Sequence, residues 1–96
     1  MAMIQAPRRA DGIVARRIAG ELLLVPVRGQ LADLQRLYVL NPVAELIWGL
    51  LDGRHELPAI QDAIASRFAV SPATAGADLK EFIDSLHAAG LLATGL

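Results

Sequence analysis

A short strand that runs directly into a capped helix start, at residues 35–42, constrains the fold most. Leu37, Tyr38 and Val39 are good strand formers, with no proline among them. Asn41 is a favourable N-cap residue, and the proline that follows it suits a first helical turn. If this strand lies at a sheet edge, its backbone groups are open to pairing with another chain.

Three strands followed by three helices are predicted along the chain. The strands are expected at residues 13–18, 21–27 and 35–40, with Ala19-Gly20 as a hairpin turn and residues 28–34 as a loop. The helices are expected at residues 42–51, 57–68 and 72–89, the last one capped by Ser71. Because strands and helices are segregated, the predicted fold class is α+β: a winged-helix-like, three-stranded antiparallel sheet followed by three helices.

Each predicted helix carries an apolar stripe, and together the stripes define the expected core. In the first helix the stripe consists of Val43, Leu46, Ile47, Leu50 and Leu51. In the second helix it consists of Ile60, Ala63, Ile64 and Phe68. In the third helix it consists of Ala75, Leu79, Phe82, Ile83 and Leu86. Trp48 is also expected to pack inside the protein.

The composition fits one packed domain. The chain has 96 residues, of which 54% are apolar, so it can bury a small core but not a second domain. We expect residues 1–11 to form a flexible arm and residues 12–96 to form the domain. The absence of cysteine excludes disulfides and thiolate metal sites and fits a cytoplasmic protein. The longest apolar run, at residues 22–27, is too short to span a membrane.

The sequence offers no catalytic constellation. His55 and His87 have no metal-ligand spacing with each other or with carboxylates. His87 follows Asp84 by three residues, a spacing that favours a surface ion pair. No glycine-rich phosphate loop follows a predicted strand. We therefore expect neither enzymatic activity nor a cofactor, and the edge strand favours peptide binding instead.

The charge distribution bears on DNA binding, the main alternative for a winged helix. Residues 1–38 hold six arginines against three carboxylates, whereas the rest of the chain holds three cations against seven carboxylates. The third predicted helix carries Asp78, Glu81 and Asp84 against a single Lys80. Phosphates would repel such a helix, so we expect neither a nucleic-acid partner nor a membrane partner.

An ordered set of short segments gives the chain a family resemblance. It comprises Gly20-Glu21-Leu-Leu-Leu, Val39-Leu40-Asn41-Pro42, Ala44-Glu-Leu-Ile47-Trp48-Gly-Leu-Leu-Asp52-Gly53, Ile60, Asp78-Leu79 with Phe82-Ile83 and Leu86, and Gly90-Leu91-Leu92. Over about residues 12–93 this set resembles the PqqD-like family of RiPP precursor peptide recognition elements. Glu56 stands where this family often has a threonine cap, and residues 26–35 differ from the members of pyrroloquinoline quinone biosynthesis.

The resemblance implies a peptide chaperone of natural-product biosynthesis. Such proteins bind the leader segment of a ribosomally made precursor and present it to a peptide-modifying enzyme, often a radical SAM enzyme. The leader adds as a strand beside the third strand and lies against the third helix. The peptide-binding residues implied for this chain are Arg36, Leu37, Tyr38, Val39, Asp78, Phe82 and Ser85.

Several of these assignments have alternatives. Tyr38 and Phe82 can line a groove or pack in the core, and Arg36 can pair with leader carboxylates or simply be solvated. Either flank of the third helix can face the edge strand; we favour the flank with Asp78, Ser85 and Ala89 over the flank with Gly76, Lys80 and His87. The protein could also be a structural subunit that stabilises an enzyme, or a homodimer paired through the open edge.

Overall fold

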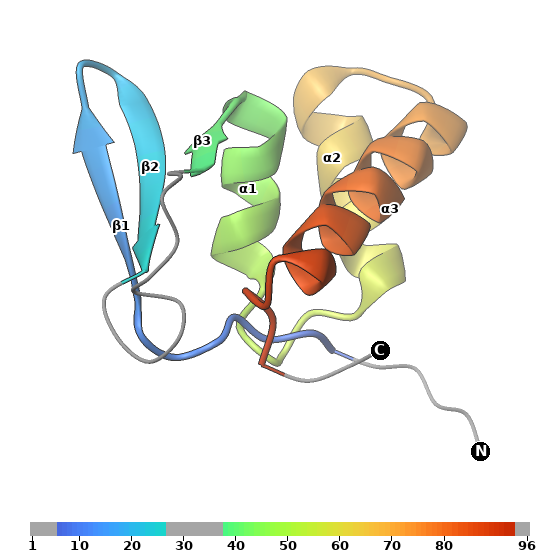
Figure 1. Cartoon of the computed structure of the whole chain (residues 1–96). Helices are drawn as coiled ribbons and strands as arrows, with labels where there is room; N and C mark the ends of the chain where they lie inside the picture. Colours follow the sequence, from blue (N-terminus) through green and yellow to red (C-terminus); the bar gives the residue numbers. More distant parts are fainter. Residues whose placement is uncertain (1–5, 27–37, 94–96) are drawn as a thin grey trace.

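The fold is a three-stranded sheet followed by three helices (Figure 1). The structure, a computed structural model, describes residues 6–26 and 38–93. The strands are β1 (Ile13–Ile18), β2 (Glu21–Pro26) and β3 (Tyr38–Leu40). The helices are α1 (Pro42–Leu50), α2 (Leu57–Phe68) and α3 (Pro72–Ala88). The predicted α+β, winged-helix-like architecture is thereby confirmed.

The sheet is antiparallel, with β2 in the centre and β3 at one edge. Leu24 of β2 lies opposite Ala15 of β1 and Tyr38 of β3. The β1–β2 turn has positive φ at both Ala19 (54°) and Gly20 (84°), which is the geometry of a two-residue hairpin turn. Among the described residues, no strand pairs with the other edge of β3. The predicted loop at 28–34 and the first part of the predicted third strand, at 35–37, lie outside the described residues.

Helix starts follow the predicted capping chemistry. The Asn41 side chain accepts a hydrogen bond from the Ala44 N–H at 2.8 Å, and Ser71 accepts one from the Thr74 N–H at 3.1 Å. Glu56 occupies the N-cap of α2 but makes no capping hydrogen bond through its side chain. Glu56, at the position where the PqqD-like family often has a threonine, therefore leaves α2 without the side-chain cap that α1 and α3 have.

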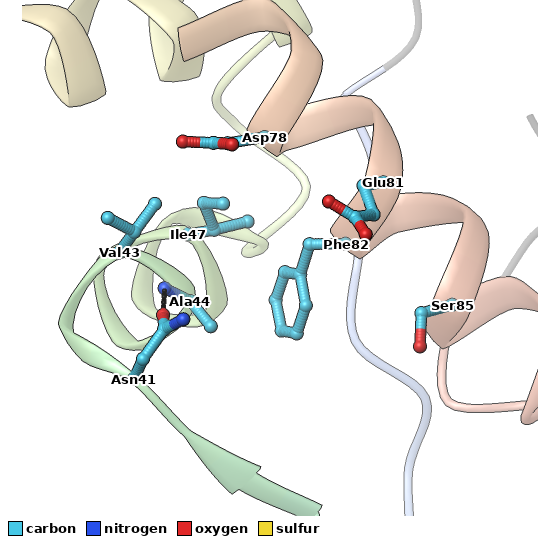
Figure 2. A pocket seen from close by; sticks show the side chains of 8 residues that line it. All are labelled: Asn41, Val43, Ala44, Ile47, Asp78, Glu81, Phe82 and Ser85. Carbon is cyan, nitrogen blue, oxygen red and sulfur yellow. Dashed lines mark hydrogen bonds between the residues drawn. The ribbon is translucent and has the colours of Figure 1, made fainter. Parts of the chain in front are cut away.

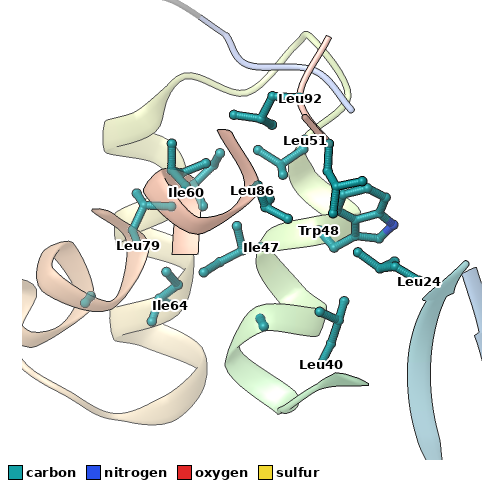
Figure 3. Packing of buried hydrophobic residues seen from close by; sticks show 14 residues of the cluster. Leu24, Leu40, Ile47, Trp48, Leu51, Ile60, Ile64, Leu79, Leu86 and Leu92 are labelled. Carbon is teal, nitrogen blue, oxygen red and sulfur yellow. The ribbon is translucent and has the colours of Figure 1, made fainter. Parts of the chain in front are cut away.

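The core lies where α1 meets the sheet on one side and α2 and α3 on the other (Figure 3). The predicted buried face of α1 is partly wrong: Ala44, Ile47, Trp48 and Leu51 are buried, whereas Val43, Leu46 and Leu50 are half-buried. The physical reason is that the sheet covers α1 on one side and α2 and α3 cover it on the other. The buried face of α1 therefore includes the side that faces Leu24 of β2. Trp48 sits next to Leu24, as expected for a packing residue.

The N-terminal segment is part of the fold. Pro7 is fully buried, the Gly53 N–H donates to the Pro7 carbonyl at 3.1 Å, and the Arg9 N–H donates to the Leu51 carbonyl at 3.0 Å. The C-terminal end closes on the same segment, because the Ala93 N–H donates to the Arg8 carbonyl at 2.8 Å. We call residues 7–10 together with 91–93 the terminal clasp. The prediction of a flexible arm is wrong for residues 7–10, and residues 1–5 lie outside the described part of the chain.

Arg9 ties the terminal clasp to α1. Its Nη1 donates to the Trp48 carbonyl at 3.0 Å, and its guanidinium lies 5.7 Å from the centre of the Trp48 ring. The carbonyl at the end of α1 gains a charged donor, and the ring gains a cation–π contact. Arg9 therefore stabilises the indole that packs against the sheet.

The loop after α1 is held by Asp52. The Arg54 N–H donates to Asp52 Oδ1 at 2.8 Å, and His55 Nδ1 lies 3.0 Å from the same oxygen. The Arg54 hydrogen bond, followed by that of His55, lowers the pKa of Asp52 from 3.8 to about 2. A lowered pKa means that the folded state favours the carboxylate. This contribution to stability is present above pH 3.8 and is lost as the pH falls toward about 2.

Replacing Arg9 with alanine tests the terminal clasp. Arg9→Ala removes a charged hydrogen bond and a cation–π contact from a half-buried site, so we expect the free energy of unfolding to fall by about 1–2 kcal/mol. Urea denaturation measures this change. The matched control is Arg16→Ala at an exposed position of β1, which should stay within about 0.5 kcal/mol of the parent. Equal effects of the two substitutions would contradict a clasp held by Arg9.

Candidate functional site

A cavity of about 360 Å³ lies between the first turns of α1 and one flank of α3 (Figure 2). We call this cavity the α1–α3 groove. Its lining residues come from these two helices and from the β3–α1 junction: Asn41, Val43, Ala44, Ile47, Asp78, Glu81, Phe82 and Ser85. Apolar side chains of α1 form one wall, and α3 supplies an aromatic ring together with polar groups. Such a lining suits a partner that has both apolar and polar side chains.

The spacing of residues along α3 places its groove residues. Asp78, Phe82 and Ser85 follow one another at i, i+4 and i+7, so they lie on one face of the helix. The buried stripe of α3 runs alongside, through Leu79, Ile83 and others, which leaves Phe82 at its margin and half-buried. The Phe82 ring projects from α3 toward the first turns of α1 (Figure 2). Phe82 is therefore a groove wall rather than a fully buried core residue.

The two flanks of α3 face different neighbours. Asp78 and Ser85 line the α1–α3 groove, whereas Gly76 and Lys80 line a separate hollow beside Leu57 of α2. The flank with Asp78, which the sequence analysis favours for peptide binding, is thus the one on the side of the β3–α1 junction. Ala89 caps the end of α3 and is not among the groove residues.

The open edge of β3 leads into the groove. Asn41 directly follows β3, caps α1 and lines the cavity. Leu40 is buried on the core face of β3, while Val39, on the opposite face, is 55% exposed. The backbone of Tyr38 pairs with that of Leu24 in β2. An edge that pairs with no other described strand and a half-apolar cavity therefore meet at the β3–α1 junction.

The predicted site is only partly brought together. Asp78, Phe82 and Ser85 share the groove, Tyr38 and Val39 lie in the edge strand, and Arg36 and Leu37 lie outside the described residues. The α1 wall and Glu81 are not among the residues predicted from the sequence, which assigns Val43 and Ile47 to the core and Asn41 to a helix cap. Their positions in the sequence carry the available signal, because α1 begins directly after the edge strand and Glu81 lies one turn from Asp78.

The α3 side of the groove is acidic. Lys80 Nζ lies 2.7 Å from Asp84 Oδ2, so the one lysine of α3 is already paired. This pair replaces the predicted surface pair between Asp84 and His87. Asp78 and Glu81 make no ion pair among residues 6–26 and 38–93. A phosphate backbone would be repelled from this face, whereas a cationic side chain would be attracted.

Within residues 6–26 and 38–93, no group of three or more histidine or acidic side chains is arranged to hold a metal ion. No helix in this part of the chain combines the length and the apolar character needed to cross a membrane.

Comparisons with known proteins identify the family. The family model of coenzyme PQQ synthesis protein D (PqqD) matches residues 21–92, which is most of the chain. The chain belongs to the PqqD family. The matched range in this PqqD-family protein begins at β2 and ends within the terminal clasp, so it contains the edge strand and all three helices.

A solved structure gives the same relationship in three dimensions. It is described as TbiB1 in complex with the TbiA(beta) leader peptide, and it is 26% identical to this chain with a TM-score of 0.75. The match covers 93% of this chain and 98% of TbiB1. Comparison with curated protein sequences gives no match.

Truncating Phe82 tests its place in the groove. Because the Phe82 ring is half-buried, Phe82→Ala should lower the free energy of unfolding by only about 1–2 kcal/mol. Leu86→Ala, at a fully buried position one turn further along α3, should cost about 2–5 kcal/mol. Chemical denaturation of both variants measures the difference. A Phe82→Ala cost equal to or larger than that of Leu86→Ala would make Phe82 a core residue.

Proposed function

We propose that this PqqD-family protein binds the leader segment of a ribosomally made precursor peptide and presents it to a peptide-modifying enzyme. The observation that carries the proposal is the open edge of β3, which leads into the α1–α3 groove. Family membership supports it, and so does the similarity to TbiB1, whose structure contains a leader peptide. In this role the chain is a peptide chaperone without catalytic chemistry of its own.

The leader would bind by strand addition. An extended peptide pairs its main chain with Tyr38–Leu40, and alternate side chains then point to opposite faces of the enlarged sheet. One set faces the groove, where Phe82 and the α1 wall can take apolar side chains. The other set lies on the same face as Val39 and stays accessible. This alternation leaves half of the leader exposed for a second protein.

Magnitudes indicate that the groove must contribute to affinity. Each backbone hydrogen bond adds about 0.5–1.5 kcal/mol net, and only alternate residues of β3 turn their backbone groups to the open edge. Ordering a flexible peptide costs about 2–5 kcal/mol, so pairing along β3 alone is insufficient. Burying one leucine- or phenylalanine-sized side chain adds about 1.5–3 kcal/mol. With two or three such contacts we expect a dissociation constant near micromolar, which corresponds to a binding free energy of about −8 kcal/mol.

The enzyme partner is part of the proposal. A modifying enzyme, for which radical SAM chemistry is the expectation from the family resemblance, would act on the precursor held by this protein. The charge of the groove also favours peptide over DNA, because the charged residues that line it, Asp78 and Glu81, are acidic and would repel phosphates. A second copy of the chain could occupy the same edge, in which case peptide and dimerisation would compete.

Two proline substitutions test strand addition. Successive N–H groups of a strand point to opposite sides, so one of Tyr38 and Val39 donates toward β2 and the other toward the open edge. Proline removes the donor in either case. The variant that keeps a parent-like melting temperature should bind peptide at least about tenfold more weakly, since it loses one hydrogen bond and the local fit. The probe is the tightest peptide from a display library of random linear peptides selected against the parent protein, measured by calorimetry.

Val14→Pro provides the matched control, because Val14 lies on β1, at the far edge of the sheet from β3. If it folds, this control should bind the probe as the parent does. Strand addition at β3 is wrong if both the Tyr38→Pro and Val39→Pro variants fold and bind with parental affinity. The proposal as a whole is wrong if selection enriches no peptide.

A further inference from the structure

The charged side chains that line the α1–α3 groove are all acidic. Asp78 and Glu81 line the cavity, and the remaining polar groups in the lining, Asn41 and Ser85, are neutral. Within the described residues, the one lysine of α3, Lys80, pairs with Asp84, and no cation forms an ion pair with Asp78 or Glu81. The two groove carboxylates therefore lack a partner among the residues that the structure describes.

The spacing of Asp78 and Phe82 matches the repeat of an extended peptide. They are four residues apart in α3, which corresponds to about 6 Å along the helix axis. Side chains at i and i+2 of a strand lie on one face and are about 6.6–6.8 Å apart. A guest strand that follows α3 can thus place one side chain at Phe82 and the next groove-facing side chain at Asp78. In Figure 2 both lie on the side of α3 that faces α1, and both line the same cavity.

We infer that the groove selects leader peptides in which a lysine or arginine lies two residues from a large apolar side chain. This inference rests on the proposed function and specifies its substrate class. The apolar side chain packs on Phe82 and Ile47, and the cation reaches Asp78, with Glu81 adding to the negative potential at the rim. Because the groove is open, salt screens this attraction, and the charge acts more on selectivity than on total affinity.

Charge reversal in the groove provides the test. A display library of random linear peptides is selected against the parent, against Asp78→Lys/Glu81→Lys, and against Asp62→Lys/Glu56→Lys. The last protein has the same net charge as the groove variant but carries its changes at exposed positions of α2 and its N-cap. The parent and the α2 control should enrich lysine or arginine two positions from an aromatic or aliphatic residue. The groove variant should enrich aspartate or glutamate at that position.

An isosteric pair covers the case in which the groove variant fails to fold. Asp78→Asn/Glu81→Gln should bind the best parent-selected peptide about tenfold more weakly, yet bind its Lys→norleucine analogue as the parent does. Selected peptides without charge bias, or a bias unchanged by the groove substitutions, would overturn the inference while peptide binding stands. Failure of every selection, the parent included, would remove the proposed function and the inference with it.

Discussion

The junction between β3 and α1 is the constraint on which the rest of the structure depends. Asn41 ends the edge strand, caps α1 through the Ala44 N–H and lines the groove. One residue thus connects the end of the edge strand, the start of α1 and the groove. Leu40 and Ile47, which are buried on either side of the junction, anchor the strand and the helix in the core.

The rigidity of the frame comes from α1 and from the terminal clasp. Trp48 packs on the sheet, and its carbonyl and ring are both engaged by Arg9 from the N-terminal segment. The last residues of the described chain then close over that segment. A small domain gains stability when its ends are tied down in this way. The terminal clasp and Trp48 thus support α1, which forms one wall of the groove.

Local rules made much of the fold predictable. The Ala19-Gly20 turn and the Asn41 and Ser71 caps marked where elements start and end, because each depends on a few neighbouring residues. The rotated face of α1 and the packed N-terminal segment were not predictable, since both depend on partners distant in sequence. For the site, helical spacing predicts that Asp78, Ser85 and Ala89 share one flank of α3 and that Phe82 belongs to the apolar stripe. In the structure Asp78, Phe82 and Ser85 line the groove and Ala89 does not. Spacing alone could not assign Val43 and Ile47 to the opposite wall.

Amide hydrogen exchange along β3 tests the central claim most directly. In the free protein, the N–H that points to the open edge of Tyr38–Leu40 should exchange rapidly, while its neighbour bonded to β2 is protected. Saturation with a bound leader peptide should protect the open-edge N–H and leave β1 unchanged. Protection of every β3 amide already in the free protein, or no change in β3 at saturation, would contradict an edge that accepts a guest strand.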